Sequence, residues 1–230
     1  MNIVFTTVPV SPEPIISWED DYTAPWRDEA LIEALGDRAW DGPVVRLARY
    51  EPRRGRRRAR MVLQRARYFD YIGTNLSPQP CERTDAIGIA ALLFTADRRC
   101  ILQQRSPTLA IRPGEIGPSM SGTLEPMDLD GARYLSQINA RREIREELGV
   151  TDVEIAHLHL MGLIREPQRS GAPELMYRGT LRLTAAELQQ RPHPEGALLF
   201  IDIMQVYTLE NRAVPVDNLM NLLVREDMGR

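Results

Sequence analysis

The sequence has 230 residues, of which 43% are hydrophobic and 27% are charged, as is ordinary for a globular protein long enough to bury a core. The formal net charge of -3 excludes a general attraction to nucleic acid or to an anionic membrane, because such binding needs an excess of positive charge. All 29 basic residues are arginines, which excludes a Schiff-base lysine and the lysine of a phosphate-binding P-loop.

The cysteine content and the N-terminal sequence favour a reducing, cytoplasmic environment. Cys81 and Cys100 fit neither a disulfide framework nor a zinc site. The first residues, "MNIVFTTVPVSPEP", have early prolines and no basic segment, unlike a secretory signal. No apolar run approaches the length of a membrane span, so we expect no membrane partner.

Residues 1–80 predict an N-terminal α+β extension. Apolar residues predict a strand over 3–10, and an amphipathic pattern predicts a helix that starts near Pro25 and ends near Gly36. Strands over 44–51 and 59–68 flank an arginine-rich segment and predict a β-hairpin. Six arginines lie at its tip, at positions 53, 54, 56, 57, 58 and 60. We expect an exposed, solvated tip; a contact with phosphate or nucleic acid is the alternative.

Residues 81–230 predict a second, larger domain. The apolar run at 86–96 predicts a strand covered on both faces, followed by a turn at 97–99 and a return strand at 100–105. A helix is predicted from about Ala132 to Leu148, ended by Gly149. Further strands are expected at 154–166, 175–184 and 197–203, and short helices at 185–191 and 217–226. This mixture predicts an α/β layered sandwich behind the extension.

Three glutamates in "ARREIREELGV" are the strongest functional signal. On a helix, Glu143, Glu146 and Glu147 fall within an arc of about 100°. Beside them, Ala140, Ile144 and Leu148 form an apolar ridge that places the carboxylates at the margin of the core. Arg141 and Arg145 point toward solvent on the other side.

Two interpretations of the glutamates are open: an ordinary surface helix with Arg–Glu pairs, or a site for a cation. Like charges one turn apart destabilise a helix, and partial burial increases that cost. A hard divalent cation such as Mg²⁺ reverses the sign, because it binds carboxylates together with waters and substrate phosphates. We favour the cation site.

The segment "REIREELGV", Arg142 to Val150, resembles the second half of the Nudix box, the signature of hydrolases that cleave nucleoside diphosphates linked to another moiety. The first half resembles "GTLEPMD", in which Asp128 takes the place of the usual glutamate. Thirteen residues separate Asp128 from Arg142, more than is usual in the family. A similar lengthening occurs in the UDP-glucose pyrophosphatase branch of the family. Four stretches of the sequence also resemble that branch: residues 65–76, 86–106, 121–126 and 162–181.

The resemblance implies a Nudix-type α/β/α sandwich with a mixed sheet and a set of functional residues. It implies that Mg²⁺, with Mn²⁺ as a substitute, binds to Glu143, Glu146, Glu147 and the backbone carbonyl of Gly122. Arg142 would brace the loop and a glutamate by ion pairing. One of the three glutamates, or Glu174 from a later loop, would orient or deprotonate the attacking water. Alternatively, Glu174 is simply an exposed residue at the start of a strand.

Substrate selection is expected from the extension and from the loop before the box. Tyr68 and Tyr71 offer aromatic faces for a base, while Thr74 and Asn75 offer polar groups for its edge or ribose. The alternative for this segment is packing in a core or turn. Two further candidates, Arg112 and Arg165, are proposed phosphate partners. His157, His159 and His193 show no catalytic or metal-binding spacing and are expected to be structural.

The resemblance therefore implies a magnesium-dependent hydrolase that cleaves UDP-glucose or UDP-galactose to UMP and a sugar 1-phosphate. Alternative substrates are ADP-ribose, a dinucleotide or coenzyme A. A non-catalytic nucleotide-binding module is a second class, and an arginine-rich nucleic-acid binder is a third and less favoured one. The sequence does not indicate an oligomeric state.

Overall fold

The computed structural model describes most of the chain, namely residues 5–6, 14–36, 40–51, 58–107, 113–133, 137–165, 171–193 and 196–228. Two compact units are present. The first consists of Met1–Gly88, Thr123–Asn139 and Gly162–Leu175, and the second of Ile89–Gly122, Ala140–Met161 and Met176–Arg230. The expected division at residue 80 concerns function, and it stays a prediction.

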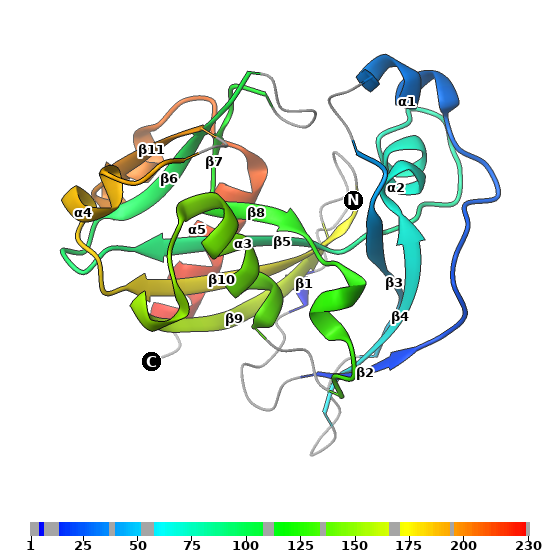
Figure 1. Cartoon of the computed structure of the whole chain (residues 1–230), viewed down its shortest axis with the longest axis horizontal. Coiled ribbons are helices and arrows are strands. Elements are labelled where there is room, and N and C mark those ends of the chain that lie inside the picture. The colour runs from blue at the N-terminus through cyan, green and yellow to red at the C-terminus, as the bar shows by residue number, and fades with distance from the viewer. Residues whose placement is uncertain are drawn as a thin grey trace. The chain divides into compact units, whose positions relative to one another are not determined.

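The strands and helices of the chain are labelled in Figure 1. The strands are β1 (Phe5–Thr6), β2 (Ile15–Trp18), β3 (Pro43–Glu51), β4 (Arg60–Arg67), β5 (Gly88–Phe94), β6 (Cys100–Arg105), β7 (Ile116–Gly117), β8 (Met120–Thr123), β9 (Ile155–Arg165), β10 (Pro173–Leu181) and β11 (Gly196–Ile201). The α-helices are α1 (Glu29–Leu35), α2 (Tyr68–Asn75), α3 (Ile138–Leu148), α4 (Ala185–Gln189) and α5 (Val214–Met228). Short 3₁₀ helices are η2 (Pro126–Leu129), η3 (Asp152–Glu154) and η4 (Ile203–Thr208).

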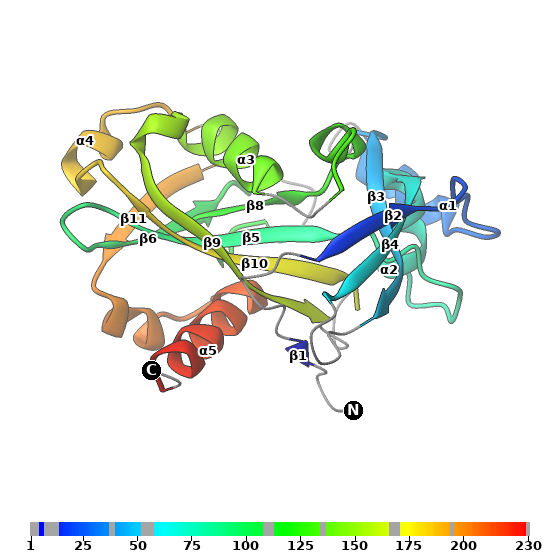
Figure 2. The ribbon, with the colours of Figure 1, turned by 90° about the horizontal axis from the view of Figure 1, so that it is seen from below.

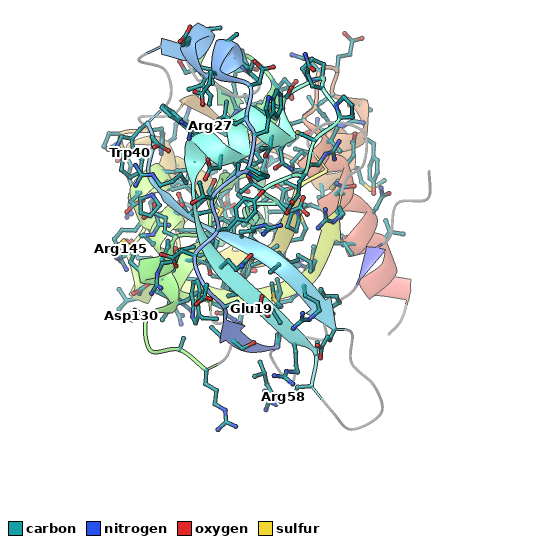
Figure 3. All side chains as sticks on the ribbon, turned by 90° about the vertical axis from the view of Figure 1, so that its right-hand side faces the viewer. Glu19, Arg27, Trp40, Arg58, Asp130 and Arg145 are labelled. Carbon is teal, nitrogen blue, oxygen red and sulfur yellow. The ribbon has the colours of Figure 1, made fainter. Side chains whose placement is uncertain are left out.

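A mixed three-stranded sheet, in the order β2-β4-β3, forms the centre of the first unit. Strand β2 is parallel to β4, and β3 is antiparallel to it, as predicted for the hairpin. Arg58 lies toward the tip of that hairpin in Figure 3; residues 52–57, with four of the six tip arginines, lie outside the described residues. The middle of β3 is joined to later segments, because Val45 N–H donates to Leu124 O (2.8 Å) and Ile87 N–H donates to Val45 O (2.9 Å).

The second unit contains most of an eight-stranded sheet with strand order β1-β9-β10-β5-β6-β11, in which β7 pairs with β6 and β8 with β5. Residues 89–93 of β5 are fully buried, which confirms a strand covered on both faces. In this unit α3 covers one face of the sheet and α5 the other, as Figure 2 shows. The predicted α/β sandwich behind an α+β segment is confirmed.

Two predicted helices begin later than expected. Helix α1 starts at Glu29 because the Asp28 side chain caps it by accepting a hydrogen bond from Leu31 N–H (3.1 Å). Helix α3 starts at Ile138. The segment before it is bonded to strand β2 instead, because Arg133 O accepts a hydrogen bond from Ile16 N–H (3.0 Å). Between Arg133 and Ile138, residues 134–136 lie outside the described part of the chain.

The end of α3 is as predicted. Gly149 adopts a φ of 62°, a left-handed conformation that glycine accepts without strain, and its N–H donates to Arg145 O (3.0 Å). Within the ranges that the structure describes, no helix is both long and apolar enough to cross a membrane.

Candidate active site

Helix α3 presents two of the three glutamates toward the interior of the second unit. The apolar ridge of Ala140, Ile144 and Leu148 is fully buried, which fixes the rotation of the helix on the sheet. Burial of a side chain the size of Ile144 contributes about 1.5–3 kcal/mol. As a result Glu143 and Glu147, which lie one turn apart, are only 9% and 2% exposed.

Strand β8 receives the Glu143 carboxylate at a glycine. A Cβ atom on Gly122 would lie 2.7 Å from Oε2 of Glu143 and closer still to Oε1. Real Cβ atoms do not approach other atoms so closely, so the carboxylate occupies space that any other residue would fill. A carboxylate can therefore approach the backbone closely at Gly122. The close approach to a cation expected there stays a prediction.

The neighbouring residue of β8 holds the second buried carboxylate. Ser121 N–H donates a hydrogen bond to Oε1 of Glu147 (3.1 Å). The Ser121 hydroxyl in turn accepts a hydrogen bond from Nη1 of Arg105, on β6 (2.9 Å). Two adjacent residues of β8 thus contact two carboxylates of α3, and the two halves of the motif meet.

Arg142 modifies the electrostatics that the sequence suggested. Its Nη1 lies 3.0 Å from Oε1 of Glu143 and 3.0 Å from Oε2 of Glu146. The Arg142 and Glu143 side chains are mostly buried (15% and 12% exposed), whereas Glu146 is 57% exposed. The expected ion pair of Arg142 with a glutamate is therefore present, and its guanidinium already neutralises part of the repulsion. The cation site stays a prediction.

The donor set around Glu143 and Glu147 fits a hard divalent cation in kind. It consists of carboxylate oxygens, one of them from a side chain that lies against the backbone of Gly122, and Mg²⁺ and Mn²⁺ prefer oxygen ligands. The glycine at 122 leaves the space that such an approach needs. However, no group of three or more His, Cys, Asp or Glu side chains among the described residues is arranged as a metal site. Glu146 is directed to Arg142 instead of completing the triad.

Asp128, the acid of the first half of the motif, serves as a helix cap. It is 4% exposed, and its Oδ2 accepts a hydrogen bond from Glu125 N–H (3.0 Å) at the start of η2. This reciprocal capping box satisfies backbone donors that the short helix leaves unpaired.

Three other predicted residues have separate environments. Glu174, at the start of β10, lies against Gly88, whose Cβ would stand 3.3 Å from Cγ of Glu174. Arg165, at the end of β9, donates to Oδ2 of Asp85 (2.8 Å) and is 44% exposed. Arg112 lies outside the described residues.

The predicted substrate residues Tyr68 and Tyr71 lie on α2, a helix that the sequence pattern did not predict. Their ring centroids are 5.7 Å apart, and both rings are half-buried against a small apolar cluster. That cluster contains Val44, Ala66 and Ala86.

Thr74 and Asn75, at the end of the same helix, are 1% and 2% exposed and bonded within the protein. The Thr74 hydroxyl lies 2.9 Å from the Thr84 hydroxyl and accepts a hydrogen bond from Thr84 N–H (3.0 Å). Asn75 Oδ1 accepts one from Asp85 N–H (3.0 Å). Both side chains fix the segment that leads into β5.

The two cysteines and His193 have no contact with the candidate site among the bonds that the structure shows for the described residues. Cys81 and Cys100 are free thiols, and burial raises the pKa of Cys100 to about 12, so it stays protonated at neutral pH. The ring of His193 has Nε2 3.1 Å from Leu188 O, and burial lowers the pKa of His193.

No family model and no curated protein matches the sequence. Solved structures are similar at low identity. A mutT/nudix family protein from Listeria innocua is 17% identical, with 63% of this chain and 96% of that chain covered and a TM-score of 0.45. The NUDIX domain of Shewanella oneidensis NrtR, complexed with ADP ribose, is 16% identical (64% and 90% covered, TM-score 0.43). A C. elegans Ap4A hydrolase is 13% identical (62% and 99% covered, TM-score 0.44). At these scores the similarity carries no functional conclusion.

Sequence reasoning missed Ser121, whose N–H holds the Glu147 carboxylate, and Arg105, which donates to the Ser121 hydroxyl. Ser121 precedes Gly122 and could have been noticed as part of "SGTLEP", but its contribution is a backbone N–H, which no residue type signals. Arg105 lies at the end of β6, and only the pairing of strands brings it to β8.

Proposed function

We propose that this protein is a Nudix-type hydrolase that cleaves the diphosphate of a nucleoside diphosphate derivative with the help of Mg²⁺. One observation carries the proposal. Glu143 and Glu147, from "REIREELGV", contact Gly122 and Ser121, from "SGTLEP", so two motif halves more than twenty residues apart in the sequence converge on one place. A salt-bridged surface helix would not bury one carboxylate against a glycine and a second one on the N–H of the residue beside it.

The residues around this place have distinct proposed roles. Glu143, Glu147 and the Gly122 carbonyl would hold the cation, and Glu146 would join them on leaving Arg142. A divalent cation bound there supplies positive charge against the diphosphate oxygens and lowers the pKa of a bound water. Ser121 N–H holds Glu147 in one orientation, and Arg105 donates to the Ser121 hydroxyl. Arg142 braces Glu143, which limits the motion of a carboxylate that must stay near the backbone.

The base that receives the proton of the attacking water would be an acid that is not fully buried. Glu146 is the exposed member of the three, and Glu174, half-buried beside Gly88, is the second candidate. A general base must reach water, and both carboxylates meet that condition better than Glu147.

For the substrate we propose UDP-glucose or UDP-galactose, cleaved to UMP and a sugar 1-phosphate. The lengthened box and the stretches that resemble UDP-glucose pyrophosphatases support this choice. Residues 1–80 would contribute to recognition through Tyr68 and Tyr71, whose rings are half-buried and tilted to one another. ADP-ribose, dinucleotides and coenzyme A are the alternative substrates.

The test is a panel of nucleotide sugars and dinucleotides incubated with Mg²⁺, with products separated by chromatography. We expect the parent protein to release UMP from a UDP-sugar and Glu147→Gln to lose nearly all turnover. Glu210→Gln, which changes an exposed glutamate elsewhere in the second unit, is the matched control and should keep full activity. Equal conversion by parent and Glu147→Gln would show that the site is wrongly assigned.

The same panel distinguishes the non-catalytic alternative. A binding module would bind one panel member in calorimetry, with no product formed at any concentration of Mg²⁺ or Mn²⁺. A nucleic-acid binder would instead show affinity for oligonucleotides that falls steeply with salt.

A further inference from the structure

A cavity of about 220 Å³ lies in the first unit, formed by strand β3 and by three later segments. Its lining consists of residues 46–50 of β3, Asp85, Leu163, Arg165 and Pro173. The cavity opens to solvent and has room for a small polar ligand.

Three arginines line the cavity, and each has a carboxylate partner: Arg46 with Glu82 (3.1 Å), Arg49 with two glutamates, and Arg165 with Asp85. Arg46 is held in place: its Nε donates to Thr84 O (2.8 Å), its Nη1 to Gln64 Oε1 (2.7 Å), and its guanidinium lies 3.7 Å from the Tyr22 ring centroid. Arg49 is 57% exposed, and its ion pairs, with Glu19 and Glu51, are both long at 3.4 Å. Its guanidinium can therefore turn to another anion at small cost.

Arg165 and Asp85 form the fixed polar pair of the cavity. Their side chains are 2.8 Å apart, and Arg165 also donates to Gly171 O (3.1 Å). Asp85 has a φ of 57°, which is uncommon for a residue other than glycine. The surroundings enforce it, because Asp85 N–H donates to Asn75 Oδ1 (3.0 Å) and Asp85 O accepts from Leu47 N–H (3.1 Å). A strained backbone held in this way is typical of binding sites.

Strand β3 is irregular where it lines the cavity. Its register against β4 shifts between Leu47 and Arg49, so Ala48 is an extra residue. Such a bulge changes the direction in which neighbouring side chains point. The apolar part of the lining includes Tyr50 and Pro173, and burial raises the pKa of Tyr50, which keeps its hydroxyl neutral.

We infer that this cavity binds a sugar phosphate. The guanidinium groups of Arg49 and Arg165 would bind the phosphate, since arginine forms paired, charge-assisted hydrogen bonds with phosphate oxygens. The Asp85 carboxylate accepts hydrogen bonds only, which suits sugar hydroxyls, and the apolar lining covers the C–H face of the ring. This inference goes beyond the proposed hydrolysis and does not need it, although a sugar 1-phosphate is also the product class of that reaction.

The test is isothermal titration of the full chain in EDTA with three probes: glucose 1-phosphate, glucose and inorganic phosphate. We expect glucose 1-phosphate to bind at least tenfold more tightly than either fragment. Arg49→Gln and Arg165→Gln should each weaken it tenfold or more. Asp85→Asn, which keeps a residue tolerant of positive φ, should abolish the preference over inorganic phosphate. Arg65→Gln, an exposed arginine on the same sheet, is the matched control and should change nothing.

Failure of glucose 1-phosphate to bind at millimolar concentration, or equal binding by Arg49→Gln, Arg165→Gln and parent, would overturn the inference. Arg49 is exposed, so its variant should fold, and thermal unfolding checks this.

A competition experiment then identifies the source of the ligand. If UDP-glucose displaces glucose 1-phosphate from Glu147→Gln, the cavity takes the sugar phosphate half of a larger substrate; if both bind together, it takes a free sugar phosphate. Because the titration needs neither metal nor turnover, failure of the proposed hydrolysis would leave its result unchanged.

Discussion

The carboxylate of Glu143, on α3, occupies the space where a side chain at position 122, on β8, would begin. Glycine is needed at 122 for room and not for an unusual backbone angle, because Gly122 is not among the residues with positive φ. The contact joins the helix of the glutamates to the strand that carries the first half of the motif. It therefore offers a direct test of whether the approach of the carboxylate to the backbone matters for activity.

Gly122→Ala should lower kcat by about 10²-fold, because a misplacement of about 1 Å in a catalytic group has that effect. The new methyl group would displace the Glu143 carboxylate from the β8 backbone. Glu210→Gln, at an exposed position elsewhere in the second unit, is the control and should keep the parent rate. Rates are compared at saturating UDP-sugar and Mg²⁺, and an unchanged rate in Gly122→Ala would contradict the role of this contact.

Arg142→Ala should lower the free energy of unfolding by about 1–3 kcal/mol, because it removes the guanidinium that pairs with the mostly buried Glu143 and with Glu146. Arg145→Ala, on the same helix, removes an exposed pair with Asp152 and should cost less than about 1 kcal/mol. Urea unfolding measures both.

Added Mn²⁺ should separate a structural from a metal-binding role of this helix. In Arg142→Ala the two glutamates lose their competing guanidinium, so Mn²⁺ should raise the unfolding midpoint more than it does in the parent. Arg145→Ala should respond like the parent. A midpoint that does not move with Mn²⁺ in any of the three proteins would show that the glutamates do not bind the ion.

The helix α3 could be predicted from the sequence because its signals are local. The spacing of Ala140, Ile144 and Leu148 gives the buried face, and Gly149 gives the end. The start could not be found in this way. Arg133 O accepts a hydrogen bond from Ile16, a residue more than a hundred positions earlier, and no local pattern predicts such a bond.

The same limit explains why only part of the candidate site was predictable. The acids were visible as a motif, but the pairing of Arg142 with Glu146 depends on rotamers and on burial. Thr74 and Asn75 looked like free polar groups after two tyrosines. The structure uses them to hold Thr84 and Asp85, ten residues later, which is a tertiary contact.

Thr74→Val should lower the free energy of unfolding by about 1–3 kcal/mol while leaving KM for the UDP-sugar unchanged. The variant leaves the buried Thr84 N–H and hydroxyl without the oxygen that they contact. Thr23→Val, at an exposed position in the same unit, is the control and should change stability little. A large rise in KM at full stability would instead support direct contact between Thr74 and the substrate.

Glu154→Gln should reduce stability at neutral pH and have little effect in acid. The Arg191 side chain, with the N–H and hydroxyl of Thr151, lowers the pKa of Glu154 from its ordinary 4.5 to about 2 in the folded protein. A depressed pKa means that the stabilisation is present above the unfolded value and is lost as pH falls toward 2.

The magnitude follows from the exposure of this pair. The Arg191 and Glu154 side chains are 26% and 24% exposed, so solvent screening reduces the contribution to on the order of 1 kcal/mol. Urea unfolding of parent and Glu154→Gln from pH 7 to pH 2 should show curves that differ above about pH 4.5 and converge below it. Glu210→Gln should follow the parent throughout. With a pKa of about 2, Glu154 is about half protonated in the folded protein at pH 2, so most of its stabilisation is lost there. A difference of undiminished size at pH 2 would therefore mean that the substitution acts through packing or the backbone.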